Sequence, residues 1–199
     1  FTQSESVSWL EPRVSMRYNL NENQVLSAGA GLHSQIQPAY TYFYQIPTGN
    51  GAEEARHNSK MDFTKSFHSV IGYSNKISQK TFLKSEIYYQ YLYNIPVEIA
   101  PSSFSMVNQG SGFARFFPDS LENSGTGSNY GLELTVQHNF DKTFFVMLTG
   151  AIYNSTYVGS DGVERNTDFN GNYATSLLAG KEFKVGKRGA ILIGTNITW

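Results

Sequence analysis

Apolar and polar residues alternate in the first well-defined segment of the chain, between Leu10 and Leu20. The even-numbered positions carry Leu10, Pro12, Val14, Met16, Tyr18 and Leu20, whereas the odd-numbered positions carry charged or polar residues. A period of two places these two sets on opposite faces of a β-strand. A polar turn follows at residues 21–23 and the alternation resumes from Leu26 to Ile36, so the two segments predict a β-hairpin.

The same alternation predicts three more hairpins along the chain. Their paired arms span residues 67–73 and 83–93, 130–140 and 144–153, and 173–183 and 191–199. Short polar segments join the two arms of each hairpin, at residues 78–80, 141–142 and 184–188. The chain is therefore expected to contain eight strands and to end within a strand.

The connections between successive hairpins are much longer than the turns within them. They run over residues 37–65, 95–128 and 155–172, and all three fall at the same end of the predicted sheet. Structureless connections of this length are uncommon in compact soluble domains. Short turns at one end and long loops at the other are typical of outer-membrane β-barrels, whose strands alternate apolar-out and polar-in.

The two faces of such a barrel are assigned by the same alternation. Val14, Leu26, Leu134 and Ile193 are expected to face lipid. The polar set is expected to face the lumen and comprises Glu11, Arg13, Arg17, Lys84, Glu86, Glu133 and either Lys181 or Glu182.

Composition supports a β-rich membrane protein. The chain holds 14 Phe, 13 Tyr and 18 Gly, and only 16% of its residues are charged, against about 25% in an average soluble domain. No segment approaches the roughly 18 consecutive apolar residues of a transmembrane helix, which excludes a helical membrane protein. Aromatic girdles are expected from residues 40–44, residues 88–93 and Trp199.

Several kinds of chemistry are excluded or disfavoured. A net charge of -1 argues against nucleic acid as a partner, and the absence of cysteine excludes disulfides, thiolate metal sites and cysteine nucleophiles. The acidic loop with Asp161, Glu164 and Asp168 lacks the pattern of a calcium loop. No GxSxG or HExxH motif is present, so we expect no enzyme, no metal and no cofactor. A hydrolase built from His33 or His68 with a loop serine and an acid is a distant alternative.

Aromatic residues in two of the long loops are the candidate ligand contacts. They are Tyr40, Tyr42, Phe43 and Tyr44 in the first loop, and Phe113, Arg115, Phe116 and Phe117 in the second. Bare aromatic side chains are unfavourable in water, so they are expected either to form a ligand platform, with Arg115 binding an anion, or to pack against one another and the membrane interface.

Several runs of the chain resemble one known family. They are Glu11 to Tyr18, Glu86 to Val97, Ser128 to Leu134, Leu148 to Ser155, Gly159 to Gly162 and Leu177 to Phe183. In this order and spacing, they are similar to the barrel of TonB-dependent outer-membrane receptors, above all the large group from Bacteroidetes. The resemblance covers essentially the whole chain.

The resemblance implies a fold and a function. Receptors of this family have a plugged barrel of 22 strands and import scarce ligands such as metal chelates, vitamins or glycans with energy from a TonB complex. Residues 1–199 are then expected to form a partial barrel from the carboxyl-terminal part, without the plug domain. The expected location is the outer membrane of a Gram-negative bacterium. The implied partners are outer-membrane lipid, the rest of the barrel, the plug, the TonB complex through the plug region and an unidentified small ligand.

The alternative is an autonomous eight-stranded outer-membrane barrel with a structural or adhesion role. The pairing of the first and last strands separates the two possibilities. An autonomous barrel requires these strands to pair and close the sheet, whereas a receptor section leaves both as edges.

Overall fold

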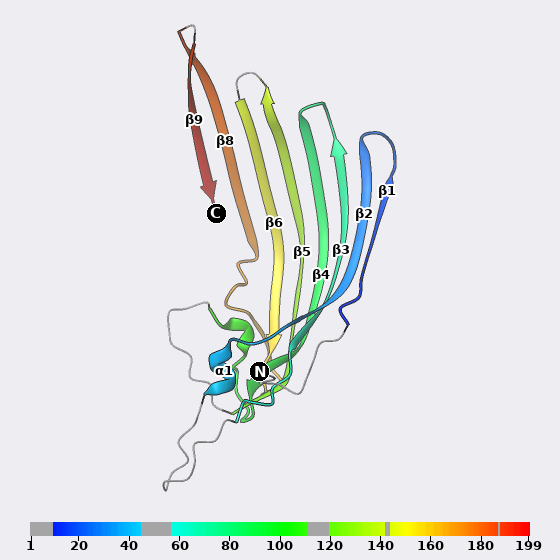
Figure 1. The fold of residues 1–199 in the computed structure, drawn as a ribbon, viewed down its shortest axis with the longest axis vertical. Helices are drawn as coiled ribbons and strands as arrows, with labels where there is room; N and C mark the ends of the chain where they lie inside the picture. Colours follow the sequence, from blue (N-terminus) through cyan, green and yellow to red (C-terminus); the bar gives the residue numbers. More distant parts are fainter. Residues whose placement is uncertain (1–9, 45–56, 111–119, 142–143, 187) are drawn as a thin grey trace.

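The computed structural model describes residues 10–44, 57–110, 120–141, 144–186 and 188–199, and these form an all-β fold (Figure 1). The strands are β1 (Arg13–Asn19), β2 (Gln24–Gln35), β3 (Thr64–Lys76), β4 (Thr81–Glu98), β5 (Leu121–Asp141), β6 (Phe144–Val158), β7 (Glu164–Asn166), β8 (Tyr173–Val185) and β9 (Gly189–Thr198). Helical structure is confined here to α1 (Ala39–Phe43) and the 3₁₀ turn η1 (Met106–Asn108). Neither they nor any other described segment forms a helix long and apolar enough to cross a membrane.

The strands form one antiparallel up-and-down sheet in the order β1-β2-β3-β4-β5-β6-β8-β9. This order confirms the four predicted hairpins. The short strand β7 was not predicted; it lies in the third long connection and pairs with the loop end of β6. The three long connections lie at one end of the sheet and the hairpin turns at the other, as expected (Figure 1).

Two strands extend further into the long connections than the alternation predicts. β4 continues to Glu98 and β5 begins at Leu121, although residues 95–128 were expected to be a loop. The register between these strands shifts on both sides of Ile95, and Asn94 adopts a left-handed backbone conformation with φ 56°. Such irregularities change which face the next residue occupies, so the alternation ends while the pairing continues.

The described sheet is open. Among the described residues, β1 pairs only with β2, and β9 pairs only with β8. The two terminal strands lie on opposite sides of the sheet in Figure 1. The alternative of an autonomous, closed eight-stranded barrel is therefore wrong for this structure, because its first and last strands do not meet.

Strand register separates the side chains into two faces as predicted. Val14, Leu26, Leu134 and Ile193 lie on one face, which we name the outer face. The opposite, inner face carries a continuous cross-strand row of Arg17, Ser27, Gly72, Glu86 and Glu133. The register also resolves the pair left open above, since Glu182 lies on the inner face and Lys181 on the outer one.

The outer face is apolar yet uncovered. Val14 is 70% exposed, Ile71 64%, Ile87 62% and Ile152 67%. The buried apolar residues lie instead near the long loops and comprise Tyr42, Met61, Ile95, Val97, Met106, Leu121 and Tyr157. An apolar surface this extensive is unfavourable in water, so the sheet requires an apolar environment along its outer face.

Aromatic side chains border the aliphatic part of the outer face. Near the loop end they are Phe67, Tyr89, Tyr91, Tyr130 and Tyr173, and near the turn end Tyr18, Tyr73, Phe144 and Phe183. Tyr88, which was expected in a girdle, lies on the inner face because it alternates with Tyr89. Two aromatic borders around an aliphatic band are typical of the outer surface of a transmembrane barrel.

Neighbouring positions on β5 test the assignment of faces. Because the chain has no cysteine, L134C and E133C variants each accept one spin label. In lipid vesicles, we expect the label at position 134 to collide mainly with oxygen and the label at 133 mainly with a water-soluble nickel chelate. The reverse pattern would contradict the register, since a slip of one residue exchanges the two faces.

Candidate functional site

The central part of the inner face is polar and closely packed. Glu86 and Glu133 lie directly opposite each other on β4 and β5, an unfavourable juxtaposition of like charges. The Lys84 ammonium lies 2.6 Å from a carboxylate oxygen of Glu86 and offsets this repulsion. A Cβ atom at Gly72 would lie 2.7 Å from the Ser27 hydroxyl, so a larger residue there would require the Ser27 side chain to move. The inner wall therefore presents fixed charges of both signs.

A polar hollow lies on the inner face between this row and the long loops. Its volume is about 340 Å³, and it is lined by His33, Ser34, Gln35, Thr64, Lys65, Ser66, His68, Gln90 and Leu92. The rings of His33 and His68, on β2 and β3, are 6.5 Å apart between centroids. The Gln90 side-chain oxygen accepts a hydrogen bond of 2.9 Å from the Asn129 amide. These groups offer imidazole, amide and hydroxyl contacts to a ligand.

A second hollow of about 240 Å³ adjoins the first and shares Gln35, Thr64 and Leu92 with it. Its other lining residues are Gln37, Ile95, Met106, Val107 and Gln109, and none of the lining residues that the structure describes is charged. The Gln37 side-chain amide donates a 2.7 Å hydrogen bond to the Thr64 hydroxyl. The two hollows together form the candidate site, which is rich in hydrogen-bonding groups and has Lys65 as the one charged residue among its described lining residues.

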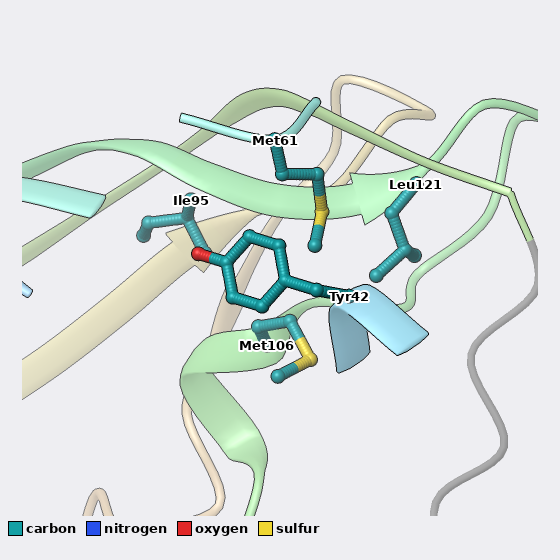
Figure 2. Packing of buried hydrophobic residues seen from close by; sticks show 5 residues of the cluster. All are labelled: Tyr42, Met61, Ile95, Met106 and Leu121. Carbon is teal, nitrogen blue, oxygen red and sulfur yellow. The ribbon is translucent and has the colours of Figure 1, made fainter. Parts of the chain in front are cut away.

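A buried apolar cluster holds the loops above the candidate site. Tyr42 from α1 packs with Met61, Ile95, Met106 and Leu121 (Figure 2). The Tyr42 ring is only 2% exposed, and its hydroxyl accepts a 3.2 Å hydrogen bond from the backbone N–H of Gln37. Burial raises the pKa of the Tyr42 hydroxyl, against the opposing effect of the Gln37 hydrogen bond. Tyr42 thus links the loop cluster to a residue that lines the candidate site.

Asparagine side chains join the first long loop to the start of β5. Asn123 accepts a 2.8 Å hydrogen bond from the Asp62 backbone N–H and donates one of 2.8 Å to the Asn94 carbonyl. The side chain of Asn58 is 1% exposed and accepts a 2.8 Å hydrogen bond from the Leu121 backbone N–H. The left-handed turn at Asn94 and the first loop are therefore held together next to the candidate site.

The second and third loops are also joined. The Ser160 hydroxyl donates a 2.8 Å hydrogen bond to the Ala100 carbonyl and accepts one of 3.0 Å from the Ser102 N–H. The Tyr157 hydroxyl donates to the Ser103 carbonyl at 3.0 Å. A Cβ atom at Gly159 would lie 2.6 Å from the Ser102 carbonyl, so glycine allows the two loops to meet. The described parts of the three loops form one connected layer.

The acidic loop is organised by an ion pair. Arg165 contacts both carboxylate oxygens of Asp161, at 2.9 and 2.7 Å. These hydrogen bonds, followed by one from the Val163 N–H, hold the pKa of Asp161 below its usual value. Glu164 and Asp168 are exposed. Within the described part of the chain, no group of three histidine or acidic side chains is placed to hold a metal ion.

The structure separates the aromatic residues that were predicted to contact ligand. Tyr40 and Phe43 are 51% and 43% exposed, Tyr44 is half-buried, and Tyr42 is enclosed in the loop cluster. Phe113, Arg115, Phe116 and Phe117 lie outside the described residues. Mutual packing therefore accounts for Tyr42, whereas ligand contact by the exposed residues stays a prediction.

The sequence did not single out Gln35, Gln37, Gln90 or Gln109, and it offered His33 and His68 only as alternative members of a hydrolase site. These residues come from different strands and loops, and only the strand register and the loop contacts bring them together. Alternation does place His33, His68 and Gln90 on the inner face. No local motif marks the residues as a group.

Comparison with solved structures identifies a similar fold. The FrpB iron transporter from Neisseria meningitidis (F3-3 variant) matches with a TM-score of 0.61 and 12% sequence identity, over 94% of this chain. This chain corresponds to only 26% of the length of that transporter. No family model and no curated protein matches the sequence.

At 12% identity, the structural match concerns the fold and not the ligand. It agrees with the antiparallel, up-and-down arrangement of the strands. It supports the general receptor-like fold and does not single out the Bacteroidetes group named by the sequence resemblance. The described chain therefore has the fold of a section of an outer-membrane β-barrel.

Truncating Tyr42 tests whether the buried cluster holds the loop layer. We expect Y42A to destabilise this layer by about 3–5 kcal/mol, as for other large aromatic truncations, because it empties the centre of the cluster. Y42F keeps the ring, loses one hydrogen bond and should cost about 1 kcal/mol. Native-state hydrogen exchange at the backbone amides of Asp62 and Leu121 measures both effects.

Truncation of Tyr40 provides the matched control, since Tyr40 lies in the same helix and is half exposed. Y40A should leave the exchange at Asp62 and Leu121 nearly unchanged. Equal loss of protection in Y40A and Y42A would show that burial of Tyr42 is not what holds the layer.

Proposed function

We propose that this chain is part of an outer-membrane transport receptor that takes up a scarce small ligand through its barrel. The observation that carries the proposal is the arrangement of the sheet: an apolar outer face, a polar inner face and a polar site directly beneath joined long loops. In barrels of this class, long loops face the exterior and short turns face the periplasm. The candidate site then lies where an incoming ligand first meets the inner wall.

The open sheet favours a receptor section over a self-contained barrel. β1 and β9 both offer unpaired edges in the described structure, and exposed edges pair readily with further strands. The match to about a quarter of an iron transporter chain is consistent with a barrel built from many more strands. We propose that the rest of the barrel pairs with these edges and surrounds a plug, with a TonB complex acting through the plug region.

The candidate site favours a ligand bound mainly by hydrogen bonds to uncharged side chains. The site offers the imidazoles of His33 and His68 and the amides of Gln35, Gln37 and Gln90, which suit the polar groups of a metal chelate, a vitamin or a glycan. Exposed loop aromatics such as Tyr40 and Phe43 add apolar contacts. Membership of the Bacteroidetes group is part of this proposal and rests on the sequence resemblance alone.

Binding of one probe from each class tests the candidate site. Ferric citrate, cobalamin and maltoheptaose are titrated calorimetrically into the full chain folded in detergent micelles. We expect one of the three to bind and H68L with Q90L to weaken its binding at least about tenfold, since each lost hydrogen bond contributes about 0.5–1.5 kcal/mol.

S74A is the matched control, because Ser74 lies on the same inner face of β3 but near the short turn. It should bind the same probe with unchanged affinity. If S74A weakened binding as much as the double variant does, the assignment of this site would be wrong. The same would follow if none of the three probes bound.

A further inference from the structure

Lys181 occupies an unusual position for a charged residue. It lies on the apolar outer face, where its cross-strand neighbours are Phe144 on β6 and Ile193 on β9. Its ammonium lies 5.2 Å from the centroid of the Phe183 ring, a cation–π contact. None of the ion pairs between described side chains involves Lys181.

The register places Lys181 at the turn end of the outer face. Its partner Phe144 is the first residue of β6, which begins just after β5 ends at Asp141. Lys181 is thus level with the turn between these strands and not with the aliphatic middle of the sheet. Lysine is strongly disfavoured at the centre of a bilayer and tolerated near its interfaces.

Neighbouring side chains fix an aromatic platform beside Lys181. The His138 ring stacks on Phe144 with a centroid distance of 4.9 Å and an interplanar angle of 16°. A 2.9 Å hydrogen bond joins His138 Nδ1 to the Thr81 hydroxyl, which itself accepts one of 3.1 Å from Ser78. We name His138, Phe144, Lys181 and Phe183 the Lys181 belt, which spans the outer face of β5, β6 and β8.

The surrounding turn end is rich in positive charge. Basic residues described there include Lys76, Lys80 and Arg188, whereas the acidic side chains described near the same turns are those of Glu22 and Glu182. This excess of basic side chains favours contact between the turn end of the sheet and an anionic surface. A lysine at a membrane surface attracts anionic lipid, and its ammonium is a good phosphate ligand.

We propose that the Lys181 belt binds the phosphate of an anionic phospholipid in the leaflet on the turn side of the barrel. The ammonium contacts the phosphate, while Phe144 and Phe183 pack against the upper part of the acyl chains. This inference rests on the membrane placement proposed above, and it assigns the lipid-binding position within it.

Lipid titration of the full chain in dodecylmaltoside micelles tests the proposal, with native mass spectrometry reporting the bound lipids. We expect phosphatidylglycerol to bind more tightly than phosphatidylcholine. K181Q should weaken phosphatidylglycerol binding about fivefold, the effect of about 1 kcal/mol expected for one lysine near an anionic surface. K181R, which keeps the charge, should retain binding within about twofold.

K184Q is the matched control, since Lys184 is exposed on the same strand but lies on the inner face. It removes the same charge and should leave the lipid affinity nearly unchanged. Inorganic phosphate at the same concentration should not compete, because a free phosphate lacks the acyl chains that Phe144 and Phe183 contact.

Three results would overturn the lipid site: equal binding of the two lipids, equal loss in K184Q and K181Q, or full displacement by inorganic phosphate. The wild-type chain is also mixed with preformed vesicles and floated on a density gradient. Failure to associate with any vesicle would count against the membrane placement itself. Association without a preference for phosphatidylglycerol would count against the Lys181 belt alone.

Discussion

The continuous antiparallel hydrogen-bond register from β1 to β9 is the constraint on which the other features depend. It sets Val14, Leu26 and Leu134 on one face and Arg17, Glu86 and Glu133 on the other. A slip of one residue in any strand would move aliphatic side chains into the polar wall and charges onto the apolar face. The polar site, the aromatic borders and the Lys181 belt all follow from this single register.

A second constraint acts where the strands end. The buried Tyr42 cluster and the hydrogen bonds of Asn58 and Asn123 join loops that leave the sheet from different strands. The loop layer is therefore a small packed unit fixed above the inner wall. Its residues Met106 and Val107 line the second hollow, which adjoins the hollow lined by His33 and His68.

The sequence was sufficient to predict the hairpins, their faces and the end at which the long loops lie, because alternation over whole strands is a strong local signal. It did not predict the loop ends of β4 and β5, since the irregularities around Ile95 shift the alternation. Nor did it distinguish the buried Tyr42 from the exposed Tyr40 two residues before it. Burial there depends on Met61, Met106 and Leu121, which are distant in sequence. The grouping of His33, His68 and Gln90 likewise required long-range register.

The claim that this chain is an open section of a larger transport barrel is tested most directly by the distance between its two edge strands. Spin labels at S15C on β1 and N196C on β9, in a spin-diluted sample in lipid vesicles, give this distance by double electron–electron resonance. An open section predicts widely separated labels, because the intervening strands keep the edges apart. A short distance within one chain would place β1 and β9 side by side, at the spacing of about 5 Å between paired strands, and would show a closed sheet instead.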